Sequence, residues 1–72
     1  MWGLKNKFMQ HGIIKKWNQS KGWGFIEGDD GYDYFLNISN LRRGIKINEG
    51  TRVKFDVTQT QRGEEAENVS LV

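Results

Sequence analysis

The sequence predicts an all-β domain, folded as a closed barrel of five short antiparallel strands. Apolar and polar residues alternate over short segments, while the three-to-four-residue spacing of a helix is not sustained anywhere in the 72 residues. A Gly-Asp-Asp-Gly turn signal at 28–31 separates two such segments, as expected for a hairpin. Because an open sheet of this size would leave long exposed edges, we expect the strands to close into a barrel.

Five segments carry the strand pattern. In chain order they are residues 12–18, 23–27, 34–38, 51–58 and 66–71. The alternation is clearest in the fourth, where Val53, Phe55 and Val57 share one face and are expected to point inward. In the first three segments the residues expected inside the barrel are Ile14, Ile26, Leu36 and Ile38. A longer basic connection, residues 39–50, joins the third strand to the fourth.

This packing sends four aromatic side chains to the outer surface. They are Trp17, Trp23, Phe25 and Phe35. Gly22 and Gly24 flank Trp23 and leave little bulk on the opposite face of that strand, which favours the outward orientation. For Trp17 an alternative stays open, because a bulge in the first strand would turn this ring inward. A patch of exposed rings is uncommon on a monomeric protein unless it binds something.

The charges are unevenly distributed, although the net charge is only +2. Residues 1–26 contain five lysines and no acidic residue, together with five of the nine aromatic residues. Acidic residues in 27–41 and 55–72 cancel most of the positive charge. Cations interleaved with aromatic rings suit a polyanion that also offers flat rings for stacking, which describes single-stranded nucleic acid.

Enzymatic and metal chemistry find little support. The chain has no cysteine, and its one histidine, His11, has no second histidine to share a metal. Asp29, Asp30 and Asp33 lack the alternating ligands and distal glutamate of a calcium loop. We therefore expect a non-enzyme without cofactor or metal. Neither a signal peptide nor an apolar run of about 20 residues is visible, so we expect a cytoplasmic protein.

Six segments, taken in order, match the pattern of one known family of small domains. Two of them are Lys21–Ile26 and Tyr34–Ile38. The flanking segments that agree are Gly12–Lys15, Trp17-Asn18, Glu49-Gly50 before Val53–Phe55, and Arg62-Gly63 before Ala66–Val69. Together they resemble the cold-shock domain family, with Lys21–Ile26 similar to its first ribonucleoprotein motif and Tyr34–Ile38 in the place of the second. The resemblance implies an OB-fold domain over residues 12–72, preceded by an N-terminal extension, 1–11. It also implies binding of single-stranded DNA and RNA on the second and third strands.

The resemblance assigns binding roles to individual residues. It implies stacking by Trp17, Trp23, Phe25 and Phe35, backbone contacts by Lys15, Lys21 and Arg62, and a base contact by Asp33. The chain departs from the family at four positions that commonly carry a ring: Lys16, Asn37, Ile38 and Ile45. We keep Lys16 and Asn37 among the expected nucleic-acid contacts, with Arg42 and Arg43 as candidate loop contacts.

We expect a monomeric, chaperone-like protein that binds single-stranded RNA or DNA by base stacking with little sequence preference. Because fewer rings are available than in typical members, binding should be weaker and more salt-dependent. The alternative is a protein-interaction module that has kept the barrel and lost strong nucleic-acid affinity, and a third reading is association with structured RNA. Trp2, Leu4, Phe8 and Met9 of the extension could form a frayed tail, an extra strand or a homodimer contact.

Overall fold

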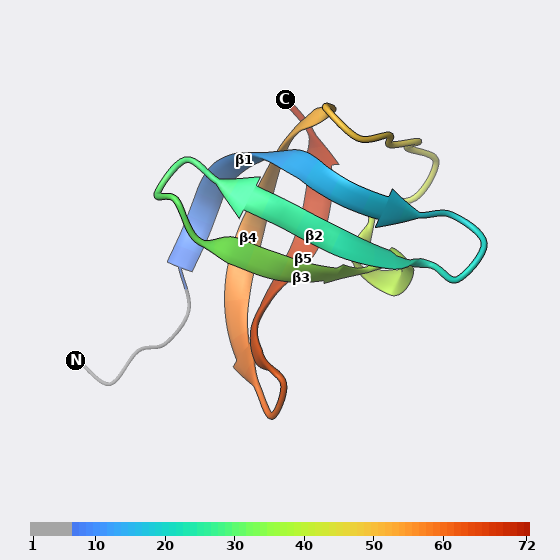
Figure 1. Ribbon diagram of the computed structural model, residues 1–72. Coiled ribbons are helices and arrows are strands. Elements are labelled where there is room, and N and C mark those ends of the chain that lie inside the picture. Colours follow the sequence, from blue (N-terminus) through green and yellow to red (C-terminus); the bar gives the residue numbers. More distant parts are fainter. Residues whose placement is uncertain (1–6) are drawn as a thin grey trace.

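The computed structural model describes residues 7–72, with side chains from residue 9 onward, and its five strands close into a barrel in the order β1-β2-β3-β5-β4 (Figure 1). The strands are β1 Lys7–Asn18, β2 Trp23–Gly28, β3 Asp33–Asn37, β4 Arg52–Thr60 and β5 Gly63–Leu71. One 3-10 turn, η1 (Ile38–Asn40), follows β3. The predicted all-β barrel is confirmed. No helix within the described residues is long and apolar enough to cross a membrane.

One seam of the barrel is parallel, whereas the sequence predicted antiparallel pairing. Phe35 and Leu36 of β3 pair with Glu65 and Ala66 of β5 in parallel, and the other four strand pairs are antiparallel. The strand count explains this difference. Strand directions that alternate around a ring cannot close consistently when the number of strands is odd, so a five-stranded barrel needs one parallel pair.

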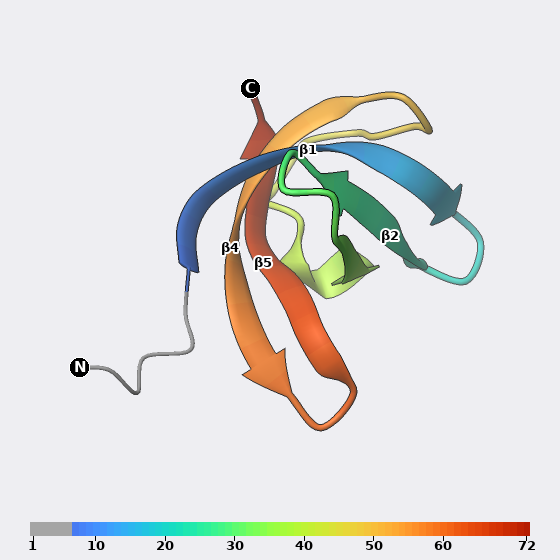
Figure 2. The ribbon, with the colours of Figure 1, turned by 60° about the vertical axis from the view of Figure 1, so that its left-hand side comes forward.

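Strand β1 pairs with two neighbouring strands and bends strongly along its length (Figure 2). Its first part pairs with β4 and its later part with β2, and Gly12 pairs with both Gly28 and Val53 at the crossing. A Cβ on Gly12 would lie 2.5 Å from the carbonyl oxygen of Glu27, so the crossing requires glycine. The bend thereby brings three strands, β4, β1 and β2, into one continuous sheet.

The first strand begins at Lys7, five residues before the start expected from the sequence. A register shift between Lys7 and Gln10 interrupts the alternation there, and Met9 has a positive φ of 59°. Its backbone N–H donates to the side chain of Asp56, 3.0 Å away, instead of following a regular ladder. A period-two pattern is therefore not visible in this segment. Of the proposed N-terminal contacts, Trp2, Leu4 and the side chain of Phe8 lie outside the described part of the chain, and Met9 is exposed.

The barrel interior is filled by ten apolar side chains that are almost fully buried. They are Ile14, Ile26, Tyr34, Leu36, Ile47, Val53, Phe55, Val57, Ala66 and Val69. The inward orientation expected for Val53, Phe55 and Val57 is confirmed. The burial predicted for Ile38 is wrong, since 42% of this residue is exposed. Strand β3 ends at Asn37, whose side chain accepts a hydrogen bond from the backbone N–H of Ser39 and starts η1, so the alternation stops one residue earlier than expected.

Candidate nucleic-acid interface

Three aromatic rings, Trp23, Phe25 and Phe35, form a ring cluster on the outer face of β2 and β3. Their centroids lie 5.8–6.4 Å apart, with the two phenylalanines edge to face and Trp23 nearly parallel to Phe35. Phe25 is the cross-strand partner of Phe35, while Gly24, Ile26 and Leu36 between them are buried. The outward orientation predicted for these three rings is confirmed. They remain half-buried because they pack against one another at favourable aromatic distances.

A β-bulge in β1 decides which side chain stands beside the ring cluster. Ile14 pairs with Ile26 but Lys16 already pairs with Phe25, so the strand carries one extra residue at this point. The bulge therefore places Lys16 directly across from Phe25, on the outer face. A cation occupies the position next to the rings.

The same bulge turns Trp17 to the opposite side of the sheet from Phe25, so its predicted outward orientation is wrong and the inward alternative describes the structure. The ring stays partly exposed, and its contact with nucleic acid remains a prediction. Trp17 lies opposite Gly24 and packs against the core cluster. A Cβ on Gly24 would lie 2.9 Å from the Trp17 ring and 2.0 Å from the carbonyl oxygen of Lys16, so the glycine makes room for both. The indole N–H donates to the Gln19 side chain at 2.9 Å.

Lys15 and Asp33, both predicted to contact nucleic acid, are paired with each other. The Lys15 ammonium donates to the Asp33 carboxylate across 3.0 Å, and both side chains are about half exposed. This hydrogen bond, together with the charge of Asp33, raises the pKa of Lys15 above its ordinary value. An exposed pair of this kind contributes little to folding stability, so a ligand can separate it readily.

Arg62 lies at the other edge of the ring cluster. Its guanidinium carbon is 4.7 Å from the centre of the Phe35 ring, within cation–π range, and its Nε is 3.9 Å from a carboxylate oxygen of Glu65. Sequence reasoning did not include Glu65 in the site. Its signal was present only as an acidic residue three positions after Arg62, a spacing with no meaning until β5 is known to run beside β3.

The remaining predicted residues lie around the edge of the cluster. Asn37 is the cross-strand partner of Trp23, and its side-chain oxygen is engaged in capping η1. Lys21 is exposed in the β1–β2 connection, where its backbone N–H donates to the side chain of Asn18 at 3.1 Å. Lys21 therefore stands just before the strand that carries Trp23, with its ammonium group in solvent.

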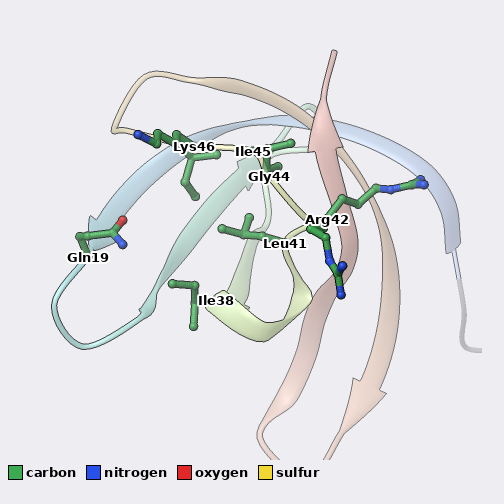
Figure 3. A pocket seen from close by; sticks show the side chains of 9 residues that line it. Gln19, Ile38, Leu41, Arg42, Gly44, Ile45 and Lys46 are labelled. Carbon is green, nitrogen blue, oxygen red and sulfur yellow. The ribbon is translucent and has the colours of Figure 1, made fainter.

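The β3–β4 connection forms a shallow pocket of about 260 Å³ beside η1. Ile38, Leu41 and Ile45 supply apolar side chains to it, and Gln19 faces it from the β1–β2 connection (Figure 3). The candidate loop contact Arg42 extends away from Gln19 in this view, and Arg42 and its neighbour Arg43 are both exposed. Two of these side chains, Ile38 and Ile45, stand at positions where the family commonly has a ring, so the pocket is lined by branched aliphatic groups there.

Comparisons with known proteins agree with this geometry. The family model of the 'cold-shock' DNA-binding domain matches residues 10–72. Cold shock protein CspC of Bacillus subtilis is 44% identical over 63 residues, which cover 85% of this chain and 96% of that protein. Cold shock protein 1 of Lactiplantibacillus plantarum is 43% identical with the same coverage, and cold shock-like protein CspLB of Listeria monocytogenes is 42% identical over 86% of this chain and 97% of its own length.

The match covers β2 to β5 in full, β1 from residue 10 onward, and all residues of the ring cluster. The general function that the family match supports is nucleic-acid binding. The family-model match and these relatives, in agreement with the closed barrel, show that the chain belongs to the cold-shock DNA-binding domain family.

Proposed function

We propose that this protein binds single-stranded RNA or DNA with low sequence specificity, by stacking bases on the ring cluster, and that it keeps the bound strand from pairing. The observation that carries the proposal is the arrangement of Trp23, Phe25 and Phe35, which are mutually packed, partly exposed and contributed by adjacent strands. Bases held on these rings are unavailable to a complementary strand, which is how a chaperone of nucleic acid works. Stacking accepts any base, because every base has a π face.

Cations on both sides of the ring cluster would guide the phosphate backbone. Lys16 stands across from Phe25 on one side, and Arg62 lies over Phe35 on the other. Lys21 extends the positive charge beyond Trp23. For single strands, each neutralised phosphate changes the slope of log K against log salt by about −0.7, so three contacts predict a slope of about −2.

Titration with labelled oligonucleotides tests the proposal. We expect a short thymine or uracil oligomer to quench the fluorescence of Trp23 at micromolar concentration and low salt, in a Trp2→Phe/Trp17→Phe variant where it is the one tryptophan left. Replacement of Phe25 or Phe35 by alanine should weaken binding about 5- to 150-fold, since a stacked base contributes about 1–3 kcal/mol. Tyr32→Ala is the matched control, because Tyr32 is a ring that is 65% exposed at the β2–β3 hairpin, outside the ring cluster.

Two outcomes would overturn the proposal. Equal loss of affinity in Phe35→Ala and Tyr32→Ala would remove the special role of the ring cluster. Absence of any binding at low salt would favour the protein-interaction alternative.

Strand protection is tested separately, by the rate at which a hairpin oligonucleotide refolds with and without the protein. A cytoplasmic location is part of the proposal, supported by the likeness to cold shock proteins of bacteria.

A further inference from the structure

The stacking surface of Phe35 is occupied by a side chain of the protein itself. The Arg62 guanidinium lies over this ring at 4.7 Å, although 63% of the Arg62 side chain is exposed and the residue sits at the β4–β5 turn. A long side chain at a turn has many conformations available, so a second interaction is needed to keep it over the ring. The cation–π contact alone is too weak, since an exposed contact of this kind contributes little free energy.

Glu65 supplies the second attachment. It is the parallel cross-strand partner of Phe35, so its side chain emerges beside the ring, and its carboxylate oxygen lies 3.9 Å from the Arg62 Nε. Only 16% of the Glu65 side chain is exposed, in contrast to its partner. The carboxylate is therefore largely buried, and the exposed Arg62 side chain lies against it.

The Thr60 hydroxyl, whose one hydrogen has two acceptors in range, lies beside that carboxylate. Its hydroxyl lies 3.1 Å from the same Glu65 oxygen that faces Arg62, and 3.0 Å from the backbone oxygen of Gly63. The Thr60 hydroxyl oxygen also accepts a hydrogen bond from the backbone N–H of Arg62. Thr60, Arg62 and Glu65 thus form one small network around the β4–β5 turn, in which the Arg62 side chain is far more exposed than that of Glu65.

We propose that Glu65 is a positioning residue that holds Arg62 over Phe35 as a displaceable cover, and that a nucleic-acid strand must move this cover before a base can stack on Phe35. Two competitions follow. A base competes with the guanidinium for the ring, and a phosphate competes with Glu65 for the guanidinium. Glu65 therefore limits affinity, and its removal should tighten binding. This inference rests on the proposed function in one respect: the ligand that displaces Arg62 is a single-stranded nucleic acid.

The first test measures binding by Glu65→Gln, which keeps the shape of the side chain and removes its charge. We expect affinity for a single-stranded thymine oligomer to rise about fivefold, the scale of a weak ion pair and an exposed cation–π contact together. Glu64→Gln is the matched control, because it changes the net charge equally one residue away, where the strand alternates to its other side. Equal tightening by both variants would overturn the proposal.

A double-mutant comparison separates the cover from simple repulsion between Glu65 and phosphates. In an Arg62→Met background no guanidinium is present, so Glu65→Gln should change the affinity less than twofold if Glu65 acts through Arg62. A persistent fivefold effect in that background would show that Glu65 repels the strand directly, and would refute the cover.

Proton NMR of the free protein tests the cover without any nucleic acid. The Arg62 side-chain protons should be shifted upfield by the Phe35 ring in the wild type and less so in Glu65→Gln. Addition of oligonucleotide should abolish the remaining shift. Retention of the full shift in the complex would mean that Arg62 is not displaced. If Phe35→Ala leaves binding unchanged, the proposed function fails at this ring, whereas the NMR result for the free protein still decides whether Glu65 holds Arg62.

Discussion

Replacing Lys16 by tryptophan should convert a cationic border into a fourth stacking ring. The bulge in β1 places this residue on the outer face, directly across from Phe25, so a ring at position 16 would adjoin the ring cluster. Nothing needs to be repacked, because Lys16 is exposed and forms no ion pair with the side chains of residues 9–72. The sequence already marked this position as one where the family commonly carries an aromatic residue.

Two opposing terms set the expected change in affinity. A new stacked base contributes about 1–3 kcal/mol, which tightens binding about 5- to 150-fold. Loss of one phosphate contact changes the salt slope by about 0.7, which weakens binding about fivefold at 0.1 M salt relative to 1 M. For a stacking contribution of about 2 kcal/mol, or about 30-fold, the net gain at 0.1 M salt is about sixfold.

Fluorescence anisotropy of a labelled oligonucleotide is the appropriate assay, because the new tryptophan would complicate intrinsic fluorescence. Lys16→Ala is the matched control, since it also lacks the ammonium group but adds no ring. Lys16→Trp should bind at least fivefold more tightly than Lys16→Ala at every salt concentration, and the two should share the same reduced salt slope. If the tryptophan variant binds no more tightly than the alanine variant, the outer-face geometry assigned to position 16 is incorrect.

Two further predictions concern the framework that supports the interface. Gly24→Ala should lower the free energy of unfolding by about 3 kcal/mol in urea denaturation, because its Cβ would overlap the backbone of β1 at 2.0 Å. The control Gly44→Ala should lower it by only about 1 kcal/mol, since that Cβ meets nothing within 4 Å and only the φ of 86° is strained. Equal losses in the two variants would contradict the clash. The hydrogen bonds from Arg52 lower the pKa of Asp29, so Arg52→Met should raise that pKa toward its ordinary value in a carboxyl NMR titration. A lowered folded-state pKa means that the pair stabilises the protein above the ordinary aspartate pKa and loses this contribution as the pH falls through the lowered value, and an unchanged pKa in Arg52→Met would refute the assignment.

The strand pattern was sufficient to predict the barrel and most of its interior. In β4 the buried and half-exposed residues alternate without interruption from Val53 to Thr58, so the period-two pattern specifies both the strand and its inner face. Phe25 and Phe35 were predictable for the same reason, because each stands between buried neighbours on an uninterrupted strand. Where the ladder is regular, local sequence determines which face a side chain occupies.

Prediction failed where the backbone departs from that ladder. Ile38 continues the alternation of β3 in sequence, but Asn37 caps η1 and removes Ile38 from the strand. The start of β1 was missed because Met9 takes a positive φ and breaks the register with β4. Glu65 was missed for another reason, since its contact with Arg62 over the Phe35 ring depends on the parallel β3–β5 seam. Such contacts depend on strand pairs that are distant in sequence.

The bulge at Lys15 and Lys16 has the largest functional consequence of these departures. One extra residue exchanges the faces of everything that follows it in β1. A regular ladder would place Lys15 across from Phe25 and Trp17 across from Trp23, whereas the bulged strand places Lys16 and Asn18 there. Trp17 is then used to cover the core, against a glycine that leaves room for it. The interface consequently has three rings bordered by cations on both sides. Phosphate contacts therefore make a larger share of the binding free energy, and base stacking a smaller one, than in a barrel with more rings. Salt should accordingly weaken binding by this protein more strongly.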